Sequence, residues 1–180
     1  MKYLSGKKYE VYMGMARNMA KLSPDQDTQV GSILLSHDGR IISSSFNGFS
    51  RGAPDEELPC TRGEVCDGGH DKYHYMHHAE RNILYNCASQ GIKTAGTTLI
   101  CTLSPCLDCL RACYASGVEY IIFDELYSSF ADIDFYKELL DITVYVDKNV
   151  MGTKFTCLSL LNKKEWDEVG KIPFWNGDKK

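Results

Sequence analysis

The stretch TTLICTLSPCLDCLRACYASGVEYIIFD, residues 97–124, contains a complete strand–helix–strand pattern. Its first part, residues 97–103, is an apolar run rich in β-favouring residues, which is typical of a buried strand. Residues 105–117 begin with proline and end with glycine, which is the usual asymmetry of a short helix. A second apolar run follows at residues 118–124. We therefore expect two buried strands joined by a helix.

The segments on both sides extend this alternation. Apolar residues spaced one turn apart predict an amphipathic helix over residues 7–22. Two apolar runs, 30–36 and 40–46, flank Asp38-Gly39 and predict a hairpin. The remaining predicted elements are a helix over 78–90, a helix over 132–140 and a strand over 142–147. A hairpin followed by three strands that alternate with helices predicts an α/β fold, in which a five-stranded mixed sheet is covered by helices on both faces.

The chain has 180 residues, which fits a single domain with a proper core. We expect that domain to span residues 1–146. Residues 47–76 show no sustained periodicity, and an irregular stretch of this length inside a compact domain tends to be functional. Residues 147–180 are less regular and end in KIPFWNGDKK. We expect them to form a tail that packs on the domain or on a neighbouring subunit.

Composition limits the partners of the protein. The net charge is −4 and the sequence pI is about 5.7. A surface for long nucleic acid usually carries a basic excess, so we do not expect that partner. No apolar run reaches the length of a membrane span, and the first residues lack the apolar core of a secretory signal. We therefore expect a cytoplasmic protein with no membrane partner.

Eight cysteines are present, and in a cytoplasmic chain close cysteine pairs are more often metal ligands or catalytic groups than disulfides. Cys106 and Cys109 form a C-x-x-C pair at a helix start, where the helix dipole favours thiolate. A redox dithiol is the alternative for this pair. His78 begins the preceding helix and supplies a third ligand, so that the fourth position of a zinc ion stays open for water. Glu80, two residues further on, can carry the proton of that water.

The combination of H-A-E at residues 78–80 with P-C-x-x-C at residues 105–109 resembles the signature of the zinc-dependent nucleobase deaminases. The order of elements is similar to the cytidine deaminase fold, a three-layer α/β/α arrangement. The stretches 28–52, 78–84 and 102–123 also resemble deoxycytidylate (dCMP) deaminases, and this resemblance covers about residues 8–146. It implies hydrolytic deamination of dCMP to dUMP and ammonia, which supplies dUMP for dTMP synthesis.

The resemblance also implies roles for single residues. Glu80 would protonate N3 of cytosine and then the leaving amine during zinc-assisted attack of water on C4. Ala79 and Ser104 would contact the pyrimidine through backbone groups. Asn47 matches an asparagine that holds the sugar, although it can equally be a turn residue before a glycine. Tyr127 matches an aromatic residue that packs on the nucleotide, with surface packing as the alternative.

Regulation is a further implication, because enzymes of this family are typically hexamers that are activated by dCTP with Mg²⁺ and inhibited by dTTP. Glycine permits close backbone approach to a triphosphate. The residues that would bind this allosteric nucleotide are Gly48, Phe49, Arg51 and Gly52.

Other chemistry-bearing residues remain. The substrate phosphate needs cations, and the candidates are Arg51, Arg62, Lys72 and Arg111. A second, structural zinc is a hypothesis for the insert, with candidate ligands Cys60, Cys66, His70 and His74, and with His77 nearby. We expect the remaining cysteines, Cys87, Cys101, Cys113 and Cys157, to pack in the core.

Two rival functions stay open. The first keeps the chemistry but changes the substrate to dCTP, free cytidine, a pterin or riboflavin precursor, or a tRNA base. The acidic balance argues against tRNA, and the long insert argues against the compact free-nucleoside enzymes. The second rival is a zinc-stabilised module that senses nucleotides without turnover. The presence of Glu80 argues against it, because a sensor needs no proton carrier.

Overall fold

The computed structural model describes residues 6–66, 68–126, 143–150 and 153–160. Within these residues a six-stranded sheet has the order β2-β1-β5-β6-β8-β7. Its strands are β1 (Gly31–Leu35), β2 (Ile41–Phe46), β5 (Thr97–Leu103), β6 (Val118–Glu125), β7 (Thr143–Val150) and β8 (Thr153–Ser159). The longer helices are α1 (Gly6–Ala20), α3 (Ala79–Ser89) and α4 (Leu107–Ala115).

The sheet is mixed. β5 and β6 pair in parallel, as the helix between them requires, whereas β1 pairs antiparallel with both β2 and β5. All five residues of β1 are buried, because both faces of this strand are covered. β2, at the edge of the sheet, is only partly buried and carries three serines.

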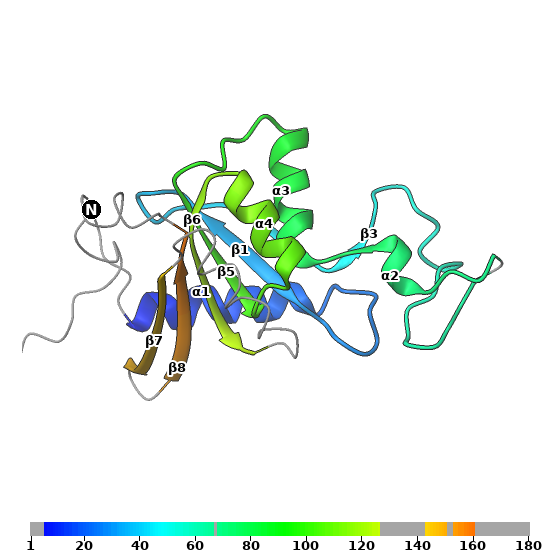
Figure 1. The fold of residues 1–180 in the computed structure, drawn as a ribbon, viewed down its shortest axis with the longest axis horizontal. Helices are drawn as coiled ribbons and strands as arrows, with labels where there is room; N and C mark the ends of the chain where they lie inside the picture. Colours follow the sequence, from blue (N-terminus) through cyan, green and yellow to red (C-terminus); the bar gives the residue numbers. More distant parts are fainter. Residues whose placement is uncertain (1–5, 67, 127–142, 151–152, 161–180) are drawn as a thin grey trace, which may run out of the picture.

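Helices cover both faces, as Figure 1 shows with α1 on one side of the sheet and α3 and α4 on the other. The α1 side of the core contains Tyr9, Met13 and Ala16, which lie about one helical turn apart and pack on Ile33 and Ile100. The other side is formed by apolar residues of α3, α4 and the opposite strand faces, namely Ile83, Leu84, Leu99, Leu110, Ile121 and Phe123.

The close approach of α1 to β1 depends on Gly31. A Cβ atom at this position would lie 1.9 Å from the carbonyl oxygen of Ala16. Any side chain would therefore push the helix away from the sheet.

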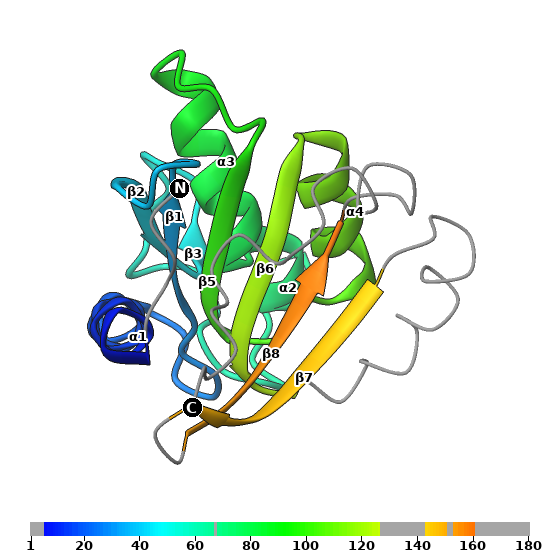
Figure 2. The same cartoon turned by 90° about the vertical axis from the view of Figure 1, so that its left-hand side faces the viewer.

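The predicted fold class is confirmed, and the sheet has one strand more than the five predicted. The extra strand, β8, begins inside the predicted tail and pairs antiparallel with both β6 and β7, so that it lies between them (Figure 2). Residues 153–159 therefore belong to the sheet of the domain. The predicted helix over 132–140 and the rest of the tail, residues 161–180, lie outside the described residues.

The insert projects from one end of the sheet (Figure 1). It contains a short two-stranded ribbon, in which β3 (Gly48–Phe49) pairs with β4 (Met76–His77), and the single turn of α2 (Lys72–Tyr75). Among the described residues, no helix combines the length and the apolar character that crossing a membrane requires.

Candidate functional site

The site is built on the amino ends of two adjacent helices. His78 is the N-cap residue of α3 and Cys106 is the N-cap residue of α4, and both have extended backbone dihedrals. Neither side chain caps its own helix, so both are available for other contacts. Cys109 lies in the first turn of α4 and is fully buried.

The three predicted ligands converge on one point. The Nδ1 atom of His78 lies 3.4 Å from the Sγ atom of Cys106 and 3.4 Å from the Sγ atom of Cys109. All three donor atoms lie within 4.8 Å of one another. A tetrahedral zinc ion with ordinary Zn–S and Zn–N bond lengths would separate a sulfur and a nitrogen ligand by about 3.5 Å. The donor set and its spacing therefore fit zinc.

The two thiols also indicate that the site suits a cation. A hydrogen bond from Cys109 lowers the pKa of the Cys106 thiol to about 3, and a hydrogen bond with His78 acts in the same direction. Burial opposes this shift. The same hydrogen bond to Cys106, together with burial, raises the pKa of the Cys109 thiol. A bound Zn²⁺ would stabilise both thiolates.

Glu80 lies beside these ligands in the first turn of α3 and is 3% exposed. Burial raises the pKa of its carboxyl group, whereas the charge of His78 acts in the opposite direction. A buried carboxyl group with a raised pKa beside a metal site is a candidate proton carrier. The geometry at this helix end can therefore combine a metal ion with a proton carrier.

A pocket opens next to these residues, and its wall has two parts. The inner part comes from the helix starts and the end of β5: His78, Ala79, Glu80, Leu103, Ser104 and Cys106. The outer part comes from the loop before β1 and from the insert: Asp25, Thr28, Val30, Asn47, Arg62, Lys72, Tyr73 and Met76. A ligand in this pocket would reach from the metal ligands to the insert.

Three of the four predicted substrate-binding residues line the pocket. Asn47 is buried, and its amide bonds to the loop before β1. The N–H of Ser104 donates to the carbonyl of Glu125, and the carbonyl of Ala79 accepts from the hydroxyl of Ser32. Tyr127 lies outside the described residues.

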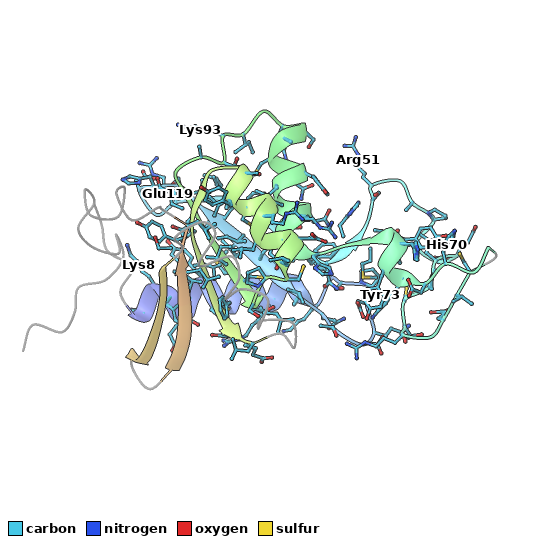
Figure 3. All side chains as sticks on the ribbon, in the orientation of Figure 1. Lys8, Arg51, His70, Tyr73, Lys93 and Glu119 are labelled. Atoms are coloured by element: carbon cyan, nitrogen blue, oxygen red, sulfur yellow. The ribbon has the colours of Figure 1, made fainter. Side chains whose placement is uncertain are left out.

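The four candidate cations for the phosphate lie in different parts of the structure. Arg62 and Lys72 line the pocket. Lys72 is 2% exposed and bonds to two aspartates, whereas Arg62 is exposed. Arg111 lies elsewhere, on α4, and pairs with Asp108 at 3.6 Å. Arg51 follows β3 and points away from the loop that carries it (Figure 3).

The residues predicted to bind an allosteric nucleotide divide into two pairs. Gly48 and Phe49 are buried and form β3, so their backbone is paired with β4. Arg51 and Gly52 lie in an exposed turn, where Gly52 has a φ of +87°. The exposed pair is the part of this segment that is accessible to a ligand.

The four candidate ligands of a second zinc do not converge. The rings of His70 and His74 lie 4.6 Å apart, whereas His74 contacts Asp71 and the thiol of Cys66 contacts Tyr75. His77 instead bonds to Ser50. Within the described ranges, His78 with Cys106 and Cys109 is the one group of three such residues whose donor atoms meet. The second zinc therefore stays a prediction.

Of the cysteines predicted to pack in the core, Cys87, Cys101 and Cys113 are fully buried. The side chain of Cys157 is not among those described.

The part of the wall before β1 was not predicted from the sequence. Residues 23–28, SPDQDT, were expected only to end a helix, yet Asp25 and Thr28 line the pocket. The two aspartates in this short turn were the sequence signal that could have indicated a functional segment. Their partner, Lys72, lies more than forty residues away and could not be assigned by spacing.

Comparisons with known proteins agree with this geometry. The model of the cytidine and deoxycytidylate deaminase zinc-binding region matches residues 6–125. The chain is 32% identical over 139 residues to a probable deoxycytidylate deaminase of Drosophila melanogaster, and 31% identical over 115 residues to the deoxycytidylate deaminase of Homo sapiens. These matches cover 73% and 63% of this chain. The chain spans 66% and 62% of the length of the two relatives.

A solved structure of dCMP deaminase from the cyanophage S-TIM5, in complex with dCMP and dUMP, matches with a TM-score of 0.63 and 27% identity. The match covers 76% of this chain and 95% of the phage protein. The matched family region contains both helix starts that carry His78, Cys106 and Cys109. The chain therefore belongs to the family defined by the cytidine and deoxycytidylate deaminase zinc-binding region.

Proposed function

We propose that this chain is a zinc-dependent deaminase that hydrolyses dCMP to dUMP and ammonia, and that it thereby supplies dUMP for dTMP synthesis. The observation that carries the proposal is the position of buried Glu80 in the same pocket as the convergent His78 and Cys106. The choice of dCMP is supported by the relatives named deoxycytidylate deaminase and by the phage dCMP deaminase structure.

The proposed chemistry assigns one role to the metal and the others to the chain. Zinc held by His78, Cys106 and Cys109 would supply the Lewis acidity that activates water for attack on C4 of cytosine. Glu80 takes a proton from this water and delivers it to N3, and later takes the second proton, from the hydroxyl group formed at C4, and delivers it to the amine. A bond from C4 to oxygen forms and the bond from C4 to nitrogen breaks, which yields a carbonyl group and ammonia.

Backbone groups orient the pyrimidine. The first N–H of a helix has no intrahelical acceptor, so the N–H of Ala79 is suited to donate to the base. The N–H of Ser104 donates to Glu125, and we propose that Ser104 contacts the pyrimidine through its carbonyl. Asn47 holds the sugar from the outer wall, and Tyr127 packs on the nucleotide.

Arg62 is our proposed phosphate ligand. It lies on the exposed edge of the pocket, and its backbone N–H is fixed by a 2.6 Å bond to Asp27. Lys72 is less suitable because two carboxylates already surround its ammonium group. In the Arg62→Ala variant the preference for dCMP over deoxycytidine should fall, whereas Arg40→Ala in the distant hairpin turn should leave it unchanged.

We also propose regulation by dCTP with Mg²⁺ as activator and dTTP as inhibitor. The exposed turn with Arg51 and Gly52, next to buried Gly48 and Phe49, supports a triphosphate site outside the catalytic pocket. Binding isotherms that stay flat for both nucleotides would remove this proposal.

A hexamer in the cytoplasm is the proposed state. Tyr85 on α3 and Tyr114 on α4 are 49% and 38% exposed, which supports burial against other copies. Sedimentation would give the number of copies. The seven described cysteines have free thiols.

The deciding experiment follows the loss of cytosine absorbance with zinc-loaded protein and four substrates: dCMP, dCTP, deoxycytidine and cytidine. Turnover of dCMP but not of the nucleosides supports the proposal, and the dCTP sample shows whether the pocket accepts a longer phosphate chain. No turnover of any substrate, even with dCTP and Mg²⁺ added as activator, would favour another base or a nucleotide-sensing module without activity.

A further inference from the structure

Lys72 is a charged residue buried almost completely at the junction between the insert and the loop before β1. Its side chain is 2% exposed, and that of its partner Asp25 is 7% exposed. The Nζ atom lies 2.8 Å from Oδ1 of Asp25 and 2.8 Å from Oδ2 of Asp27. Both aspartates belong to the loop before β1, whereas Lys72 begins α2 in the insert. The two ion pairs therefore join the two segments that form the outer wall of the pocket.

The charges of this cluster argue against direct phosphate binding by Lys72. Two carboxylates and one ammonium group leave a net charge of −1. A phosphate dianion placed there would meet repulsion from both aspartates and would compete with existing bonds. The two aspartates thus explain why the charge of Lys72 can be buried. Its position in the pocket wall calls for a role other than phosphate binding.

Asp25 connects Lys72 to Asn47. Its Oδ1 atom accepts from Lys72 and from the backbone N–H groups of Asp27 and Thr28. Its Oδ2 atom lies 3.4 Å from Nδ2 of Asn47. The same Asn47 amide donates to the carbonyl of Thr28 at 2.9 Å, and its oxygen accepts from the N–H of Val30 at 2.7 Å.

These contacts fix the orientation of the Asn47 amide. If the amide turned over, its oxygen would face the carboxylate of Asp25 and the carbonyl of Thr28, and two acceptors would repel it. In the observed orientation both N–H groups have acceptors, so the oxygen is the atom that Asn47 can offer to a ligand. An oxygen accepts a bond from a hydroxyl group, which is the group that a sugar provides.

We propose that Lys72 is a positioning residue, which sets the affinity for the nucleotide by holding Asp25 and Asp27 and, through Asp25, the amide of Asn47. This inference rests on the proposed function. Lys72 takes no part in the reaction at C4, because its bonds lie on the outer wall and not at the metal ligands. Its loss should act on KM rather than on kcat.

The test compares Lys72→Met, Asn47→Ala and the double variant in steady-state assays with dCMP. Lys72→Met should raise KM about tenfold and change kcat less than about threefold. This pattern is expected when the substrate and the transition state lose the same amount of binding energy. Because both residues act through one network, the double variant should show no larger KM than the worse single variant. Additive effects on KM, or an unchanged KM in Lys72→Met, would overturn the inference.

A matched control separates positioning from simple loss of stability. Arg17 forms an ion pair with Asp124 that also joins distant segments, α1 and the end of β6, but neither residue lines the pocket. Arg17→Ala should lower the melting temperature and leave KM unchanged. A rise of KM in Arg17→Ala equal to that in Lys72→Met would show that any destabilisation produces the effect, and would also overturn the inference.

A second variant covers the case in which Lys72→Met does not fold. Asp27 is 32% exposed, so Asp27→Asn weakens one of the two ion pairs without leaving a deeply buried charge unpaired. It should raise KM about threefold with kcat retained; an unchanged KM contradicts the inference. Absence of dCMP turnover in the wild-type protein would instead overturn the proposed function, and hydrogen exchange of the insert in Asp27→Asn would then still test the anchoring by Lys72.

Discussion

The Nδ1 atom of His78 and the Sγ atom of Cys106 lie 3.4 Å apart, although 28 residues separate them in the chain. The contact exists because each residue is the N-cap of its helix, and α3 and α4 lie side by side on one face of the sheet. The fold thus brings the three predicted ligands together from the starts of two separate helices.

Loss of one sulfur ligand should remove the metal. We expect Cys109→Ser to bind much less zinc and to lose deaminase activity, because the hydroxyl of serine stays protonated and is a weak zinc ligand. Zinc content by atomic absorption and dCMP turnover are the measurements. Cys113→Ala is the control, since Cys113 is equally buried one turn further along α4. Full zinc content in Cys109→Ser would contradict the assignment.

Removal of the carboxyl proton carrier should slow turnover strongly and spare the metal. We expect Glu80→Gln to lower kcat about a hundred- to ten-thousand-fold, which is the range that a general acid–base group contributes. The zinc content should equal that of the wild-type protein. Glu10→Gln, on the exposed surface of α1, should have no effect. A kcat close to the wild-type value in Glu80→Gln would mean that another group carries the proton.

Much of this site could be predicted from the sequence because its elements are local. The start of α4 is indicated by the proline before Cys106, and its end by a glycine. The apolar runs of β5 and β6 indicate these two strands. Three residues near two helix starts then suffice to suggest a metal site. No such local signal identifies the outer wall, where Lys72 meets Asp25 only after the insert has folded back on the loop before β1.

The strand β8 was missed for a similar reason. Its sequence, TKFTCLS, alternates weakly and follows a segment that we expected to be a tail. Its position between β6 and β7 is set by long-range pairing, in which Ile121 faces Leu158 and Tyr120 faces Ser159. Pairing of this kind depends on partners elsewhere in the sheet rather than on local propensity.

Two glycines of the α1 region should respond in opposite directions to the same substitution. In Gly31→Ala the new Cβ would lie 1.9 Å from a backbone carbonyl, so we expect a loss of about 3 kcal/mol or more in the free energy of unfolding. At Gly14, inside α1, a Cβ meets nothing within 4 Å. Gly14→Ala should therefore gain about 0.5–1 kcal/mol from helix propensity. Denaturant unfolding of both variants checks this; equal effects would contradict the packing of α1 on β1.

Acid should weaken the junction between the insert and the loop before β1. The hydrogen bond from Lys72, and then that from the N–H of Arg62, lower the pKa of Asp27 below its usual value of 3.8. A carboxyl group with a lower pKa in the folded state binds fewer protons there than in the unfolded state. Its stabilising contribution is therefore complete above the unfolded pKa and is lost as the pH falls through the folded pKa.

We consequently expect Asp27→Asn to reduce stability at neutral pH and to have progressively less effect as the pH falls below about 4. Urea unfolding of both proteins as a function of pH measures the difference. Asp55→Asn, on the exposed surface of the insert, controls for loss of a charge. A difference that stays constant down to pH 2 would show that the ion pair with Lys72 does not supply this stability.

The number of zinc ions bound per chain tests the hypothesis of a second zinc in the insert. Cys60, Cys66, His70 and His74 would supply four ligands, but His74 contacts Asp71 and Cys66 contacts Tyr75 in the described structure. Since only His78, Cys106 and Cys109 converge among the described residues, this geometry leads us to expect one zinc per chain. His70→Ala should then keep that zinc, whereas Cys109→Ser should lose it. Two zinc ions in the wild-type protein and one in His70→Ala would establish the second site, and would require the insert to draw His70 and His74 toward the two cysteines when metal binds.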